Sequence, residues 1–226
     1  MLIPYSVDVP MRRYPLANWA LIALTVIVGG IFIVDPEPLE PYLLLWRGDA
    51  FDPNQLPGHL LGHADWPHLF GNMLFLFVFG NAINARIGHL YFLLLYAVCG
   101  IIAGLVWLGL GTGPASLGAS GAIMGLVGCF IVLYPRNDIS VLYWFFIRFA
   151  GTFEISAYWI ILMYVAFDLW GLFAGNDHGV NYLAHVAGFV TGFGIMTTLC
   201  ATKLIPPDRA EQTLVDLCMR RNSARA

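Results

Sequence analysis

Long stretches without charge constrain this chain more than any other feature. No Asp, Glu, Lys or Arg occurs between residues 87 and 135. Charged residues make up 11% of the 226 residues and apolar residues 59%, whereas an ordinary soluble domain carries about 25% charged residues. Too few charges remain to cover a water-facing surface, which excludes a water-soluble monomer and a disordered chain. The net charge of −3 gives no electrostatic case for binding nucleic acid.

The charge-poor stretches predict six membrane-spanning helices, since a helix needs about 20 apolar residues to cross the hydrocarbon core. The run 87–135 is too long for one helix, and Gly111-Thr112-Gly113-Pro114 divides it in two. The other spans are 14–34, 66–85, 155–174 and 178–200. We expect an all-α membrane protein: a six-transmembrane-helix bundle at 14–202, with a long interfacial loop, 35–65, between the first two helices. Residues 1–13 form an N-terminal arm and 203–226 a C-terminal tail.

Loop charges predict the orientation. With six spans, ten of the eleven basic residues fall on the side that holds both termini, and only Arg47 falls on the other. Because cytoplasmic loops carry the excess of Lys and Arg, both termini should be cytoplasmic. The first apolar run is longer than a cleavable leader and reads as a retained anchor. The compact layout without an added domain favours a multi-pass protein of the bacterial inner membrane.

Strongly polar side chains inside the spans are functional candidates, because they are costly in lipid. They are His68 and Asn72, Ser120, Asp168, and His185. Asn72, Ser120 and His185 each lie about six residues inside an even-numbered span, or roughly 9 Å deep at 1.5 Å per residue. Three spans packed together would bring them into one shallow, water-reachable pocket.

This set of side chains is typical of nucleophilic catalysis. A serine hydroxyl becomes reactive when a neutral imidazole removes its proton, and acyl transfer needs donors for the developing oxyanion. His68 and Asn72, four residues apart, share a helix face and can donate N–H groups. Small residues allow the close helix approach that such a site needs. They are Gly118 and Gly121 beside Ser120, and Ala184, Gly188 and Gly192 around His185.

Taken together, these motifs resemble the rhomboid family of intramembrane serine proteases over about residues 16–200. The resemblance rests on His63-x4-His68-x3-Asn72, Gly118-Ala119-Ser120-Gly121 and Ala184-His185-x2-Gly188-x3-Gly192, with Trp46-Arg47 in the first loop. It implies Ser120 as nucleophile and His185 as general base, in a dyad without a third acid. His68 and Asn72 would then stabilise the oxyanion.

The same resemblance implies a serine endopeptidase that cuts membrane-anchored, single-span proteins within or next to their transmembrane helices. It implies no cofactor. Two positions depart from the family pattern. Asn84 stands where a Glu is frequent, which bears on stability at the cytoplasmic side, and Met124 replaces an aromatic residue that packs on the histidine.

Other interpretations remain open. A catalytically inactive rhomboid-like protein that binds or escorts membrane proteins would keep the fold, and a small transporter would favour charges at the bilayer midplane. We expect no metal site, because His59, His63 and His68 lack a His-Glu-x-x-His pattern. His63 is expected to make a structural hydrogen bond. Asp168 is expected to face the outer interface or a neighbouring helix rather than to orient His185.

Trp46 and Arg47 read most simply as interfacial anchors. The aromatic segment 137–154 has no functional interpretation. Neither the physiological substrate nor the oligomeric state follows from the sequence.

Overall fold

The computed structural model describes residues 2–145, 149–175, 179–206 and 211–223. Five helical segments are long and apolar enough to cross a membrane. They are α1 (Leu16–Val34), the continuous run α4 (Trp66–Phe75), η2 (Leu76–Gly80, a π-helical turn) and α5 (Asn81–Ile87), then α6 (His89–Leu110), α8 (Ala157–Ala174) and α9 (Tyr182–Ala201). Each coincides with an expected span to within a few residues.

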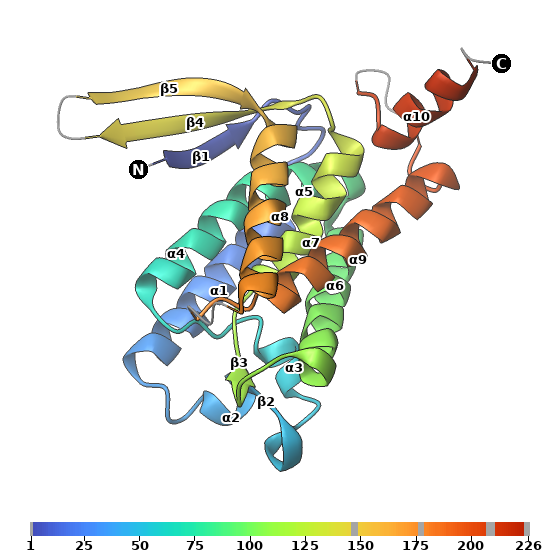
Figure 1. The fold of residues 1–226 in the computed structure, drawn as a ribbon. Coiled ribbons are helices and arrows are strands. Elements are labelled where there is room, and N and C mark those ends of the chain that lie inside the picture. The colour runs from blue at the N-terminus through green and yellow to red at the C-terminus, as the bar shows by residue number, and fades with distance from the viewer. Residues whose placement is uncertain (1, 146–148, 176–178, 207–210, 224–226) are drawn as a thin grey trace.

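The remaining expected span is shorter than predicted. Helix α7 (Ser120–Leu133) has 14 residues and is about 21 Å long at 1.5 Å per residue. The chain before it stays extended, because Pro114 lacks a backbone donor and Gly118 has a φ of +122°. In this segment β3 (Ala115–Ser116) pairs with β2 (Leu45–Trp46) of the first loop. The extended segment carries the chain inward before α7 begins (Figure 1).

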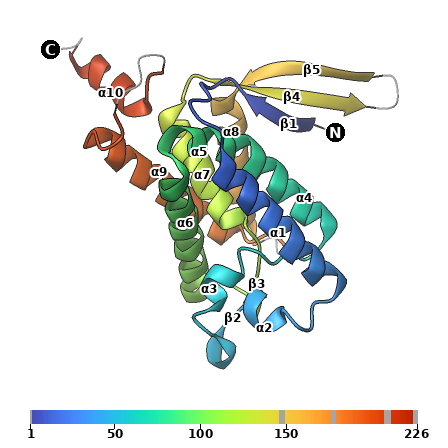
Figure 2. The ribbon, with the colours of Figure 1, turned by 180° about the vertical axis from the view of Figure 1, so that it is seen from behind.

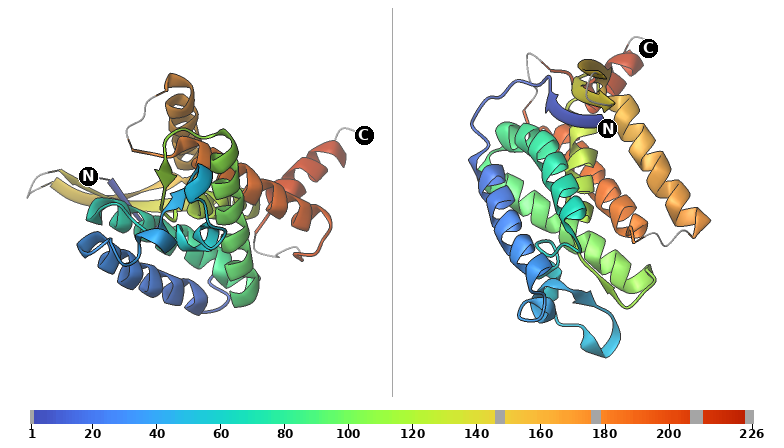
Figure 3. Two further views of the ribbon diagram at one scale, coloured as in Figure 1. Left: turned by 90° about the horizontal axis from the view of Figure 1, so that it is seen from below. Right: turned by 90° about the vertical axis from the view of Figure 1, so that its left-hand side faces the viewer.

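Helix α7 occupies the centre of the bundle. Every residue from Gly121 to Leu133 is buried, and its main neighbours are α6 and α9. Figure 2 shows α6 passing along α7 on the side away from α8. In the right-hand view of Figure 3, α1 and α8 stand at the two edges of the bundle.

The long loop 35–65 is structured and packs on the end of the bundle. It contains α2 (Glu40–Leu43), β2, η1 (Gly48–Ala50) and α3 (Gln55–Gly58). Arg47 differs from the expected interfacial anchor. Its guanidinium donates to the carbonyl oxygens of Leu108, at 3.0 Å, and Gly111, and lies over the ring of Trp107. Arg47 therefore caps the C-terminal end of α6, where a cation is favoured.

The opposite end of the bundle carries an unexpected β-sheet, so the all-α expectation is incomplete. Strands β1 (Leu2–Val7), β4 (Asp138–Phe145) and β5 (Phe149–Ser156) form an antiparallel sheet in the order β1-β4-β5. The sheet extends sideways from the helices (Figure 1). β-Branched and aromatic residues favour strands, and Ile139 and Val141 alternate inward to join the core. The described part of the segment 137–154 is thus mostly β-strand, and residues 2–7 of the N-terminal arm supply the third strand of the sheet.

The C-terminal tail also packs on the helices. Helix α10 (Leu214–Ser223) contacts α7 and α9. Both termini lie at the end of the bundle that carries the sheet (Figure 1).

A buried polar network joins α1 to α5 and includes one of the two departures from the family pattern. Asn84 is fully buried and its Oδ1 accepts from the backbone N–H of Asn18. Asn18 in turn donates to Leu76 O at 2.9 Å and to Asn81 Oδ1 at 2.8 Å. The amide at position 84 is therefore supported by hydrogen bonds within the core.

Candidate functional site

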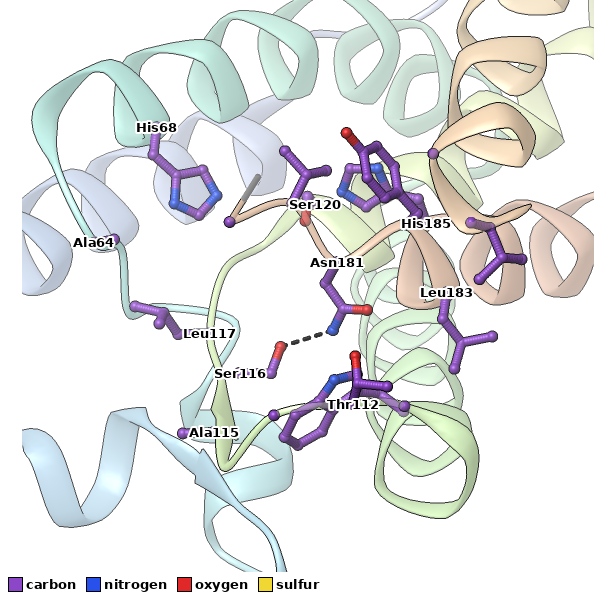
Figure 4. A pocket seen from close by; sticks show the side chains of 18 of the residues that line it. Ala64, His68, Thr112, Ala115, Ser116, Leu117, Ser120, Asn181, Leu183 and His185 are labelled. Atoms are coloured by element: carbon purple, nitrogen blue, oxygen red, sulfur yellow. Dashed lines mark hydrogen bonds between the residues drawn. The ribbon is translucent and has the colours of Figure 1, made fainter. Parts of the chain in front are cut away.

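A pocket of about 860 Å³ opens at the end of the bundle opposite the β-sheet. Its lining includes all four side chains to which the sequence assigned chemical roles: His68, Asn72, Ser120 and His185. They come from three elements far apart in the chain, α4, α7 and α9. In Figure 4, Ser120 lies between His68 on one side and His185 on the other.

Ser120 owes its position to the start of α7. It is the first residue of the helix, not about six residues inside it as the sequence suggested. The first N–H groups of a helix have no intrahelical acceptor, and the helix dipole favours negative charge there. The Ser120 hydroxyl therefore lies beside free backbone donors, which suits a reaction that builds up negative charge on an oxygen.

Glycines set the distance between α7 and α9. A Cβ atom added at Gly188 would clash with the carbonyl oxygen of Gly121, and one at Gly192 would clash with that of Gly125. The two backbones are therefore in direct contact. Gly121 also lies close to the carbonyl of Ala184. Ser120 precedes Gly121 and His185 follows Ala184, so both residues lie where the backbones of α7 and α9 approach each other.

The imidazole of His185 has a carboxylate partner. Its Nδ1 lies 3.0 Å from Oδ1 of Asp168 on α8. Asp168 thus faces a neighbouring helix, which was one of its expected surroundings, but its direct contact with the His185 ring was not expected. An Nδ1–H that donates to the carboxylate leaves the lone pair on Nε2. Among the described residues, no hydrogen bond joins the Ser120 hydroxyl to His185, and such bonds are frequently long before substrate binds.

A second network holds Asn72 on α4. The Nδ1 of His63 donates to Leu61 O at 3.2 Å, which leaves Nε2 to accept from Asn72 Nδ2 at 2.9 Å. Burial lowers the pKa of His63 to about 4, so the ring stays neutral and keeps its acceptor at ordinary pH. His63 makes the structural hydrogen bond that the sequence predicted, and it orients the Asn72 amide.

His68 lies against Gly118. The first turn of α4 is capped by Asp65, whose side chain accepts from the His68 backbone N–H at 2.7 Å. A Cβ atom at Gly118 would lie 3.1 Å from His68 Nε2 and 3.8 Å from Ser120 Oγ. The absence of a side chain at Gly118 therefore allows the imidazole and the hydroxyl to approach the same point. Gly118 has a φ of +122°, which glycine adopts without strain.

A second serine lines the same pocket. Ser116 Oγ accepts from Asn181 Nδ2 at 2.8 Å (Figure 4). Unlike Ser120, it lies on β3 and away from the contact between α7 and α9. Ser116 is therefore a natural comparison for any chemistry assigned to Ser120.

Sequence reasoning missed two features of the site. The first is the pairing of Asp168 with His185, although Asp168 is the only charged residue in its span. The second is Asn181, which caps α9 by accepting from the Ala184 N–H at 3.0 Å and also holds Ser116. In the described part of the chain, no group of three or more His, Cys, Asp or Glu side chains is placed to hold a metal ion.

Comparisons with known proteins agree on one family. Residues 52–202 match the model of the rhomboid domain. The chain is 30% identical over 189 residues to "Rhomboid protein 1, mitochondrial" of Saccharomyces cerevisiae, covering 77% of this chain and 50% of the yeast protein. It is 33% identical over 141 residues to "Rhomboid-like protein 11, chloroplastic" of Arabidopsis thaliana, covering 58% and 46%.

A bacterial relative is more distant. "Rhomboid protease GlpG" of Klebsiella pneumoniae is 25% identical over 184 residues, covering 79% of this chain and 61% of that protein. The chain thus matches about half of the length of the yeast and plant relatives and somewhat more of the bacterial one.

Proposed function

The chain belongs to the rhomboid family, and on that premise we propose that it is an intramembrane serine endopeptidase. Its substrates would be membrane-anchored, single-span proteins, cut within or next to their transmembrane helices. The observation that carries the proposal is the single pocket that gathers Ser120, His185, His68 and Asn72 from three helices. No metal or cofactor takes part in the proposed reaction.

In the proposed reaction, Ser120 Oγ attacks the carbonyl carbon of the scissile bond. Nε2 of His185 takes the hydroxyl proton, and the carbonyl oxygen becomes an oxyanion. The imidazolium then gives this proton to the leaving amine as the C–N bond breaks, which leaves an ester on Ser120. Water, activated by the same imidazole, hydrolyses the ester and regenerates the serine.

Donors around the pocket suit the oxyanion. They are the Asn72 amide, the His68 ring and the backbone N–H groups at the start of α7. The network through His63 holds Asn72 in one orientation, and preorganised donors of this kind stabilise a developing charge most effectively. Gly118, Gly121 and Gly188 support the site by permitting the close approaches described above.

We further propose that α7 is the sixth span, screened from lipid by its neighbours, since only it and the five long helices are apolar and helical over ten or more residues of the described chain. Arg86 lies in the last turn of α5, and Arg136 and Lys203 follow the ends of α7 and α9. These basic residues, at the end that holds both termini, support a multi-pass protein with cytoplasmic termini. A bacterial inner membrane stays a prediction of the sequence.

The test is cleavage of a model single-span substrate by the protein in liposomes. Ser120→Ala should lower the rate by at least about 1,000-fold, whereas Ser116→Ala, which removes a different serine hydroxyl of the same pocket, should leave it within about twofold. A full rate in Ser120→Ala would remove this serine from its role.

One observation favours a second candidate, an inactive rhomboid-like protein that binds or escorts membrane proteins. It is the absence, within the described residues, of a hydrogen bond between Ser120 and His185. A fluorophosphonate probe separates the two functions, because only an activated serine reacts with it. Capture of intact single-span proteins without labelling or cleavage would favour the escort function.

A further inference from the structure

Asp168 occupies an unusual place on α8. Most of this helix faces outward: Phe167 and Trp170 are 62% and 71% exposed, whereas Asp168 is 8% exposed. The only charged residue of the helix is therefore turned into the bundle. A buried carboxylate in a membrane-spanning segment is costly unless it is paired.

The partner of Asp168 is the ring of His185. Their side chains are 12% and 16% exposed, and the Oδ1–Nδ1 distance is 3.0 Å. In the part of the chain that the structure describes, Asp168 has no lysine or arginine partner and no other hydrogen bond. The hydrogen bond to His185, the base of the proposed function, therefore offsets the cost of burying this carboxylate.

We propose that Asp168 is a positioning residue that completes a Ser120–His185–Asp168 relay, in place of the dyad without a third acid that the family resemblance implies. The proposal rests on the proposed function. Asp168 holds the proton on Nδ1, so that the Nε2 lone pair faces the pocket, and its charge stabilises the imidazolium that forms when Ser120 loses its proton.

Other groups also act on this imidazole. His68 of α4 is close enough to repel it when both rings are charged, and Asp65, at the start of α4, lies beside His68. Tyr182, one turn earlier on α9, has its ring 6.5 Å from that of His185. Asp168 differs from all of these because it bonds directly to a ring nitrogen of His185.

A simpler role would be to join α8 to α9. Asp168→Asn separates the two roles, because it keeps the size of the side chain and one acceptor but removes the charge. For the relay, kcat should fall by at least about tenfold with KM changed less than twofold, and Ser120 should react correspondingly more slowly with a fluorophosphonate. Asp168→Asn removes the negative charge beside the imidazolium, so the acid-side decline of activity should move to lower pH.

Asp168→Ala supplies the matched control for packing. If Asp168 only joins the helices, Asp168→Asn will keep the wild-type kcat and pH profile, and Asp168→Ala will lower thermal stability without moving the acid-side decline. Either result overturns the proposal. If the wild-type protein itself neither cleaves nor labels, the proposed function fails instead, so the two failures are distinguishable.

A measurement on the unmodified site covers the case in which the variants do not fold. In protein labelled with ¹⁵N-histidine, the neutral His185 ring at pH 8 should carry its proton on Nδ1. A neutral ring protonated on Nε2 would contradict the relay.

Discussion

Helices α7 and α8 both border the pocket that contains Ser120, but they differ in how much of each helix is buried. In α7, every residue from Gly121 to Leu133 is buried. In α8, which is longer, the buried residues are Ala157, Ile161, Asp168 and Gly171. The serine thus lies on a helix enclosed by protein, and the carboxylate lies on a helix that exposes most of its surface.

The α7–α9 contact is tightly held, whereas α8 is held by fewer buried contacts. The contact between α7 and α9 is made by backbone against backbone, so the relation of Ser120 to His185 has little freedom. Helix α8 packs on the bundle mainly through α9 and few buried side chains. It is therefore a wall of the pocket that few buried contacts hold in place, and on the proposed function this is where a substrate helix would enter.

The largest effect is expected where the rigid contact is broken. Gly188→Ala places a methyl group against the Gly121 carbonyl, so α7 and α9 must separate. We expect a loss of about 1–3 kcal/mol or more in stability and loss of cleavage, measured by thermal unfolding in detergent and by substrate assay. Gly194→Ala, on the same helix with open space at its Cβ, should be neutral or slightly stabilising. Equal effects of the two changes would refute the close contact.

The next largest effect is expected for Gly118→Ala, which should lower cleavage more than it lowers the stability of the helical bundle. Its methyl group would press on the His68 ring and approach Ser120, and its positive φ adds strain. Cleavage should fall by at least about tenfold while the fold is kept. Gly113→Ala has the same kind of strain, at a φ of +84°, but nothing within 4 Å of the new Cβ. If this control loses as much activity, strain alone explains the result.

A smaller effect is expected on how stability depends on pH, through the hydrogen bond between His63 and Asn72. Burial lowers the pKa of His63 to about 4, against about 6.5 in an unfolded chain. Between these values the unfolded state binds the proton and the folded state does not, so stability should fall as pH drops from about 6.5 towards 4. His63→Gln keeps an acceptor for Asn72 and cannot titrate. The difference between its thermal midpoints at pH 7.5 and 5 should therefore be smaller than in the wild type.

In His63→Gln, the loss of stability at low pH should be smaller than in the wild type but still present, because burial also lowers the pKa of His59. An unchanged pH dependence in His63→Gln would show that His63 is not kept neutral by the fold.

The smallest effect is expected on the exposed face of α8. Trp170→Leu and Phe173→Leu alter side chains that are 71% and 83% exposed. Cleavage in liposomes should stay within about twofold of the wild type. A large loss in either variant would show that this face does more than contact lipid, and it would weaken the contrast between α7 and α8.

The sequence predicted much of the helical layout and selected four of the polar residues that line the pocket. Strongly polar side chains are few in charge-free runs, so Ser120, His185, His68 and Asn72 could be selected before their arrangement was known. The short length of α7 was harder to predict, because Pro114 to Ala119 is apolar enough to continue a span. It becomes extended through pairing with residues 45–46, a contact between distant parts of the chain.

Three further features depend on tertiary structure. Helix α8 is apolar on every side, so periodicity could not tell which way Asp168 points. The segment 137–154 is rich in aromatic residues, and its strands pair with each other and with the distant N-terminal residues 2–7. Asn18, in the first span, was not selected as a polar candidate. The structure shows it in a buried hydrogen-bond network.

The most direct test of the central claim is to locate the adduct of a fluorophosphonate on the protein by peptide mass spectrometry. We predict a single modified residue, Ser120, with the adduct absent from His185→Ala and retained in Ser116→Ala. Modification of another residue, or cleavage by a protein whose Ser120 is never modified, would contradict the claim that this hydroxyl and the imidazole of α9 act together.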